Sequence, residues 1–102
     1  MNDSEFIQLT EAAFSRIQQG LENSELDFEE PANGIIEVEF DDGSKIVINR
    51  HSVAREIWVA ARSGGFHFRH DGSAWKDTRD GTELFAKLAA LISAQGGTAH
   101  FD

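Results

Sequence analysis

The hydrophobic pattern that decides the fold lies in residues 35–49, which read IIEVEFDDGSKIVIN. In the first half, Ile36, Val38 and Phe40 alternate with Glu37 and Glu39, which predicts a strand with one buried side and one side in water. The second half, residues 45–49, is a β-branched run that predicts the returning strand. Asp-Gly between two such halves is a strong signal for the tight turn of a β-hairpin. We therefore predict two antiparallel strands, with Ile46 and Ile48 facing the interior.

Shorter alternating runs follow this hairpin toward the C-terminus and predict more antiparallel strands. They lie at residues 55–60, 66–69 and 74–76, and residues 98–101 form a further candidate strand. In the segment that precedes the hairpin, Pro-Ala-Asn-Gly at residues 31–34 predicts a turn.

Two amphipathic helices flank these strands. Between Phe6 and Leu21 the apolar residues recur every three or four positions, which predicts a helix of about five turns capped by Asn2, Asp3 or Ser4. Near the C-terminus, Asp80 and Glu83 resemble a capping box that opens a second helix. Its apolar stripe runs from residue 84 to residue 92, Glu83 and Lys87 have the spacing of a supportive ion pair, and Gly96-Gly97 ends it.

The size and the element order define the fold class. At 102 residues the chain is long enough for one domain, spanning residues 1–102, and too short for two. Each helix has one apolar stripe and each strand has one apolar side. We therefore expect an α+β two-layer sandwich, with both helices on one face of an antiparallel sheet of about five to six strands.

Charge and composition exclude several classes of function. The net charge is −9, which opposes binding to nucleic acid. Residues 1–42 hold twelve acids and Arg16 as their single base, whereas residues 43–102 are slightly basic. The chain has no cysteine, so thiolate chemistry is excluded and a reducing compartment such as the cytoplasm is favoured. No stretch predicts a membrane span or a signal peptide.

The N-terminal acids form the clearest candidate binding surface. Glu11 and Glu22 lie on one polar stripe of the first helix, and Glu25, Asp27 and Glu29 crowd the segment that follows it. Carboxylates without imidazole or thiolate suit a hard cation, such as Mg²⁺, Ca²⁺, Mn²⁺ or iron, held weakly. In many proteins, acidic runs do no more than keep a surface solvated. Cation binding and simple solvation both stay open as interpretations.

Trp58 is the second unusual residue. If Ile57 and Val59 fill the core, the alternation leaves Trp58 on the water-facing side of the sheet, where an exposed tryptophan is typical of a docking site. A register shifted by one residue would instead make Trp58 an ordinary core residue. His67 lies on the same face, whereas Trp75 is expected in the core. The other histidines, His51, His70 and His100, are expected to be exposed or hydrogen-bonded rather than to bind metal.

Several segments together resemble one known family over essentially the whole chain. The matching segments, in order, are residues 1–6, 42–50, 57–60 and 64–68, and Trp75. In these segments the chain is similar to the frataxin family, in its bacterial CyaY branch. The resemblance implies the same α+β sandwich and a role in iron–sulfur cluster assembly, in which the protein binds Fe²⁺ or Fe³⁺ weakly and uses no organic cofactor.

The resemblance also implies partners and site residues. The expected partners are the cysteine desulfurase and the assembly scaffold, contacted by a monomer of this chain, and iron-dependent oligomerisation of the chain stays open. The acidic ridge that would bind iron corresponds to Asp3, Glu11, Glu22, Glu25, Asp27 and Glu29. The residues expected to contact partners are Glu22, Glu25, Asp27, Asn49, Trp58 and His67.

Three positions depart from the family pattern. Gln18 and Gln19 stand where bacterial relatives often have a glutamate pair, and Asn23 replaces an acid, so the ridge loses ligands at its middle. The resemblance implies an iron adaptor or regulator rather than an enzyme. The alternatives are a ferroxidase that stores iron, for which the helix lacks a Glu-x-x-His pair, and a protein-binding module indifferent to metal.

Overall fold

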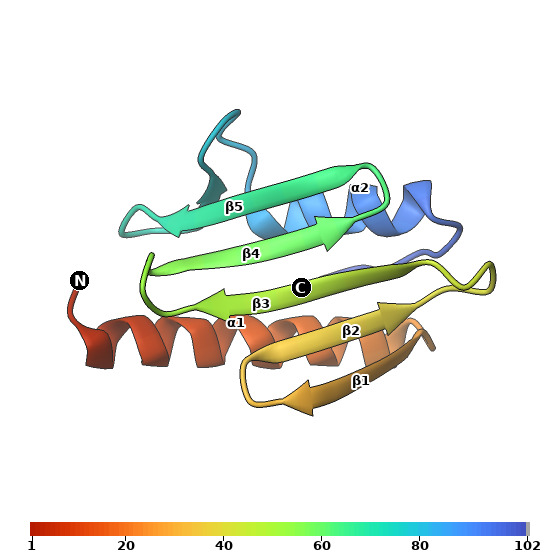
Figure 1. Ribbon diagram of the computed structural model, residues 1–102, viewed down its shortest axis with the longest axis horizontal. Helices are drawn as coiled ribbons and strands as arrows, with labels where there is room; N and C mark the ends of the chain where they lie inside the picture. Colours follow the sequence, from red (N-terminus) through yellow and green to blue (C-terminus); the bar gives the residue numbers. More distant parts are fainter. Residues whose placement is uncertain (102) are drawn as a thin grey trace.

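The computed structural model describes residues 1–101 and consists of two helices on one face of a six-stranded antiparallel sheet (Figure 1). The elements are α1 (Asp3–Asn23), β1 (Asp27–Ala32), β2 (Ile35–Glu39), β3 (Lys45–His51), β4 (Glu56–Ala61), β5 (Gly64–His70), β6 (Trp75–Asp77) and α2 (Leu84–Ala94). Each strand pairs with its neighbour in sequence, in the order β1-β2-β3-β4-β5-β6. The predicted α+β sandwich is confirmed.

The hairpin of β2 and β3 forms as the alternation predicts. Val38 pairs with Ile46 and Ile36 with Ile48, and all four side chains are at most 1% exposed. The turn between the strands places Gly43 at a φ of 84°, a left-handed conformation that glycine adopts without the steric penalty of a side chain. The predicted inward side of the hairpin is therefore confirmed.

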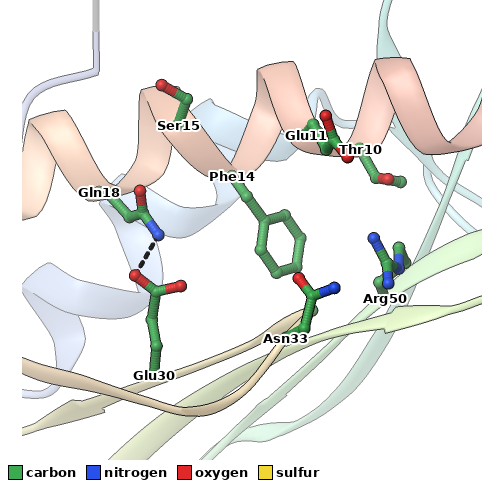
Figure 2. Close-up of a pocket in the computed structure, with 9 residues that line it drawn as sticks. Thr10, Glu11, Phe14, Ser15, Gln18, Glu30, Asn33 and Arg50 are labelled. Carbon is green, nitrogen blue, oxygen red and sulfur yellow. Dashed lines mark hydrogen bonds between the residues drawn. The ribbon is translucent and has the colours of Figure 1, made fainter.

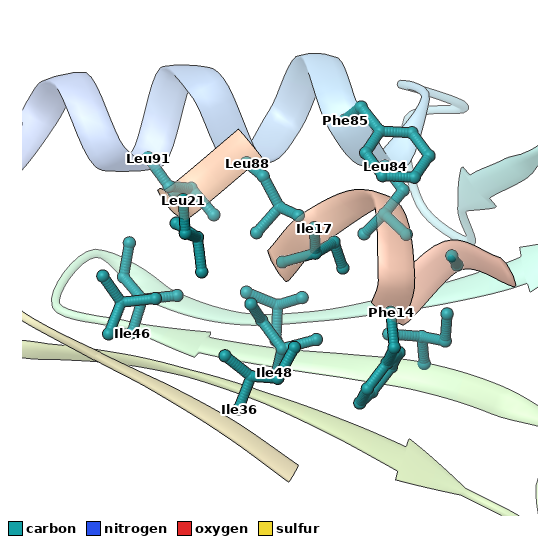
Figure 3. Close-up of a cluster of buried hydrophobic side chains, with 14 of the residues drawn as sticks. Phe14, Ile17, Leu21, Ile36, Ile46, Ile48, Leu84, Phe85, Leu88 and Leu91 are labelled. Atoms are coloured by element: carbon teal, nitrogen blue, oxygen red, sulfur yellow. The ribbon is translucent and has the colours of Figure 1, made fainter. Parts of the chain in front are cut away.

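The core lies between this sheet face and the two helices (Figure 3). Figure 1 places α1 behind the β1–β3 side of the sheet and α2 behind β4 and β5. Trp75 is 4% exposed and lies in this core, as predicted. Among the buried helix side chains of this core are Phe14, Ile17 and Leu21 from α1 and Leu84, Phe85, Leu88 and Leu91 from α2. Neither helix has the length and apolarity that a membrane span requires within residues 1–101.

The first strand corrects the prediction for the segment after α1. Residues 27–32, expected to be a connection with a turn at Pro31, form the edge strand β1. The alternation is weak here because only Phe28 turns toward the core. Pro31 has no N–H to donate, which a sheet tolerates on an edge strand, and the pairing with β2 is irregular between Glu29 and Ala32.

The predicted strand at residues 98–101 is wrong. This segment is irregular and lies against the helices rather than in the sheet. Ala99 is buried, the ring of Phe101 lies 5.8 Å from that of Phe85, and Nη2 of Arg16 donates to the Phe101 carbonyl at 3.2 Å. The tail thus buries apolar side chains on α1 and α2, and the sixth strand of the sheet is β1.

The start of α2 also differs from the predicted capping box. Glu83 is itself the N-cap and accepts hydrogen bonds from the backbone N–H groups of Phe85 and Ala86. The carboxylate of Asp80 binds Nζ of Lys87 at 2.9 Å, and Asp77 lies 3.3 Å from the same nitrogen. The hydrogen bond from Lys87, together with that from the Thr82 N–H, lowers the pKa of Asp80 to about 2. The predicted pairing of Glu83 with Lys87 is therefore wrong, because capping occupies Glu83.

The contact of the C-terminal tail with α1 generates a prediction at Gly20. A Cβ at this position would lie 2.7 Å from Cε1 of Phe101 and 3.0 Å from the carbonyl oxygen of His100. Alanine favours a helix over glycine by about 1 kcal/mol, so Gly20→Ala would stabilise a free helix. Because the tail must shift, we expect Gly20→Ala to lower the thermal unfolding midpoint.

A double-mutant cycle checks the cause. In a Phe101→Ala background, most of the steric conflict disappears, and Gly20→Ala should then be neutral or stabilising. An equal destabilisation in both backgrounds would contradict the proposed contact.

Candidate functional site

Four carboxylates meet on the open face of the sheet, where β1 pairs with β2. Asp27 lies directly opposite Glu39, and Glu29 lies directly opposite Glu37. Like charges at opposed positions of an antiparallel pair destabilise it. Within residues 1–101, the base closest to these four side chains is Lys45, whose Nζ lies 4.0 Å from Glu37. The sheet therefore holds an excess of negative charge along this edge.

The same charge continues around the end of the sandwich. A groove of about 590 Å³ lies between the end of α1, the β2–β3 turn and the end of α2, and five carboxylates line it. They belong to Glu25, Asp27, Glu39, Asp41 and Asp42. Hydrogen bonds from Ser44 and the guanidinium of Arg62 hold the pKa of Asp42 below its usual range, so this carboxylate stays ionised.

Helix α1 adds acid at its C-terminal end. Glu22 is exposed in the last turn, and no basic residue lies in that turn to offset the negative end of the helix dipole. The backbone N–H of Glu25 donates to the Glu22 carbonyl at 3.1 Å, which places the two residues next to each other. The surface that we call the acidic edge consists of Glu22, Glu25, Asp27, Glu29, Glu37 and Glu39.

The other two predicted ridge residues lie away from this edge. Asp3 is about 28 Å along the helix axis from Glu22, given a rise of about 1.5 Å per residue, and it forms an ion pair of 2.6 Å with Arg55. Glu11 is about 16 Å from Glu22 by the same measure. These acids cannot share one ion with the acidic edge.

Glu11 instead lines a small pocket between α1 and the β1–β2 turn, with a volume of about 160 Å³ (Figure 2). At the end of this pocket nearest the acidic edge, the side-chain amide of Gln18 donates to the carboxylate of Glu30. Gln18 thus faces an acid of β1, whereas Gln19 faces along the helix and donates to Asn23 at 3.2 Å.

The donors of the acidic edge suit loosely held cations. All of them are carboxylate oxygens on exposed or half-exposed side chains. In residues 1–101, no three His, Cys, Asp or Glu side chains converge closely enough to hold a metal ion. The arrangement fits a weak hard-cation surface and a docking surface for a basic protein better than a coordination cage.

The centre of the open face carries a stack of three aromatic rings. The indole of Trp58 on β4 lies between the imidazoles of His51 on β3 and His67 on β5. The ring centroids are 3.7 Å and 4.3 Å apart, with interplanar angles of 14° and 8°. Asn49 pairs with Trp58 in the β3–β4 ladder. The predicted place of Trp58 and His67 on the open face is confirmed, and we call the three rings the aromatic stack.

Beneath the aromatic stack lies a buried carboxylate that the sequence pattern did not single out. Glu56 is 6% exposed, accepts a hydrogen bond of 2.8 Å from Nε1 of Trp58, and binds Nη2 of Arg69 at 2.6 Å. Burial raises the pKa of this carboxyl, but the hydrogen bonds from Trp58 and Arg69 outweigh it and hold the pKa below the usual value. Glu56 is therefore an ionised group inside a largely neutral face.

Sequence reasoning missed part of each surface. Glu37 and Glu39 looked like the ordinary wet side of a strand, because the strand that places acids opposite them was not predicted. The alternation also put Glu56 on the open face, but nothing local indicated that neighbouring strands would bury it. His51 was expected to be exposed or hydrogen-bonded; it accepts a bond from the Ala54 N–H and also stacks on Trp58.

Comparisons with known proteins agree on one family. Residues 1–98 match the family model described as a frataxin-like domain. A protein of Dechloromonas aromatica, named iron-sulfur cluster assembly protein CyaY, is 57% identical over 101 residues, covering 97% of this chain and 96% of that protein. A protein of the same name from Janthinobacterium sp. is 48% identical, covering 95% and 92%.

The fold gives the same result. A solved frataxin of Psychromonas ingrahamii superimposes with a TM-score of 0.92 at 32% identity, covering 100% of this chain and 99% of that one. The resemblance seen in the sequence is therefore confirmed, and the chain belongs to the frataxin-like family.

Proposed function

We propose that this chain is an iron-binding adaptor of iron–sulfur cluster assembly, which docks on the cysteine desulfurase complex through its acidic edge. The observation that carries this proposal is the pairing of Asp27 with Glu39 and of Glu29 with Glu37, where Nζ of Lys45 lies 4.0 Å from Glu37. Opposed like charges cost folding stability. A basic partner or a cation offsets that cost, which supports a binding role for this surface.

Electrostatic attraction to a basic partner sets the association rate and the orientation of docking in this proposal. The acidic edge extends from the open face around the end of the sandwich, where the groove adds Asp41 and Asp42. A negatively charged surface accelerates the encounter with a positively charged partner and orients that partner, and salt weakens both effects. The aromatic stack provides a second, less charged contact with the assembly complex, since tryptophan is enriched among interface residues that dominate affinity.

Iron binds the same carboxylates weakly in this proposal. Oxygen ligands on flexible exposed side chains exchange readily, which suits delivery of iron or response to it better than storage. The chain itself makes and breaks no bond. Because it has no cysteine, we place this work in a reducing compartment, the cytoplasm.

Neutralising the acidic edge tests the docking. We expect Glu22→Gln/Glu25→Gln/Asp27→Asn to slow association with the cysteine desulfurase by about tenfold and to flatten its dependence on salt. Surface plasmon resonance at several salt concentrations measures both. The matched control, Thr78→Lys/Ala86→Lys/Ala90→Lys, makes the same change of net charge at exposed positions in and before α2. Equal effects of both triple variants would mean that only net charge matters.

Gln18 provides a test of the iron site. Gln18→Glu places a second carboxylate against Glu30, and we expect the affinity for Fe²⁺ to rise several-fold, because affinity increases with the charge of the ligands. Anaerobic calorimetry measures it. Gln19→Glu is the control, since it adds the same charge on a side chain that faces Asn23. If neither variant changes the affinity, the Gln18–Glu30 position contributes no ligand to the iron site.

The absence of catalysis is tested by oxygen consumption. Because the carboxylates lie on separate exposed side chains, we expect the chain to leave the rate of Fe²⁺ oxidation by O₂ at the protein-free value. An oxygen electrode measures the rate after Fe²⁺ is added, with and without the protein. A rate that increases with protein concentration would favour the ferroxidase alternative.

A further inference from the structure

The indole of Trp58 is held more firmly than a docking tryptophan on an open sheet requires. His51 covers one face of the ring and His67 covers the other, and both imidazoles lie nearly parallel to it. The ring is therefore confined to one plane. A partner cannot stack on either face of this indole, so it contacts the ring at its edge.

Glu56 adds the remaining constraint. It lies two residues before Trp58 on the same side of β4, and its Oε1 accepts the indole N–H at 2.8 Å, which fixes the rotation of the ring within its plane. Nδ1 of His67 lies 3.7 Å from the same oxygen, and Arg69 donates to Oε2 at 2.6 Å. One carboxylate thus contacts the indole, one of the two imidazoles that cover it, and a guanidinium from β5.

The position of Glu56 argues against a purely stabilising ion pair. A carboxylate is costly to bury, and the side chain of Arg69 is 66% exposed, so water screens much of its attraction. Because a buried ion pair is weak evidence for stabilisation, the pair with Arg69 does not by itself explain a carboxylate at this position. The buried carboxylate is explained better by what it does to the Trp58 ring, which it orients before any partner arrives.

We propose that Glu56 is the positioning residue of Trp58 and holds the indole edge-on for its contact with the desulfurase complex. The proposal rests on the docking role of the aromatic stack given above. Ordering a side chain at an interface costs affinity, and a side chain that is already ordered avoids this cost. Glu56 therefore contributes to binding through Trp58, without needing to touch the partner.

The first experiment uses the isolated protein, so it does not depend on any partner. In a ¹⁵N–¹H NMR spectrum the two tryptophans give two indole N–H signals, and buried Trp75 serves as the internal reference. We expect Glu56→Leu to move the Trp58 signal upfield and to speed its exchange with water, with the Trp75 signal unchanged. Arg69→Met, which leaves the Trp58–Glu56 bond intact, should preserve the Trp58 signal. Glu56→Gln should preserve it too, because the amide oxygen still accepts the N–H.

The second experiment measures affinity for the cysteine desulfurase complex in a double-mutant cycle. We expect Glu56→Leu to weaken binding by about two- to tenfold, the effect of one side chain that must be ordered on binding. Glu56→Gln should restore most of this loss. In a Trp58→Ala background, Glu56→Leu should have no further effect, because no indole remains to be positioned. Thermal unfolding of each variant checks whether the fold is kept.

The outcomes separate the two proposals. An unchanged Trp58 signal in Glu56→Leu, or the same loss of affinity with and without Trp58, would overturn the positioning role. If Trp58→Ala binds the complex as tightly as the original chain, the docking contact of the aromatic stack is wrong and the role of Glu56 in binding falls with it. The spectra would then still report whether Glu56 orients the ring.

Discussion

The alternation of side chains across the sheet is the constraint on which the rest of the structure depends. Ile36, Val38, Ile46 and Ile48 are almost completely buried on one face, and a slip of one residue in any of these strands would carry its apolar set into water. The register is thereby determined by the core. This register also sets every pairing on the opposite, open face, including pairings of side chains that repel each other.

The acidic edge is such a pairing. Because Phe28 and Val38 pair toward the core, Asp27 must meet Glu39 and Glu29 must meet Glu37 on the other side. The free energy lost to repulsion between these carboxylates is small compared with the free energy gained by burying the apolar side chains that set the register. The fold can therefore hold a surface that is locally unfavourable, and that surface is available for a cation or a basic protein to stabilise.

The aromatic stack results from the same register but has the opposite character. The pairing that places Ile57 beside Phe68 in the core places Trp58 beside His67 in water, and His51 reaches the indole diagonally from β3. Here the neighbouring side chains attract one another, and the carboxylate of Glu56 accepts a hydrogen bond from the indole N–H of Trp58. The open face thus has a mutually repelling border at β1–β2 and an ordered centre at β3–β5. We relate the border to charge-driven encounter and the centre to specific contact.

The sequence by itself determined the two-layer class, both helices, the central hairpin and the open-face position of Trp58, because each depends on a periodicity or a turn signal within a short stretch. It did not determine β1, because the side-chain pattern of residues 27–32 does not predict a strand and the strand forms by pairing with β2. It also did not determine the tail at residues 98–101, which packs on the helices. The burial of Glu56 and the opposition of Asp27 to Glu39 were likewise decided only by the tertiary structure. Both depend on side chains from neighbouring strands, and a short stretch of sequence does not indicate which residues strand pairing will bring together.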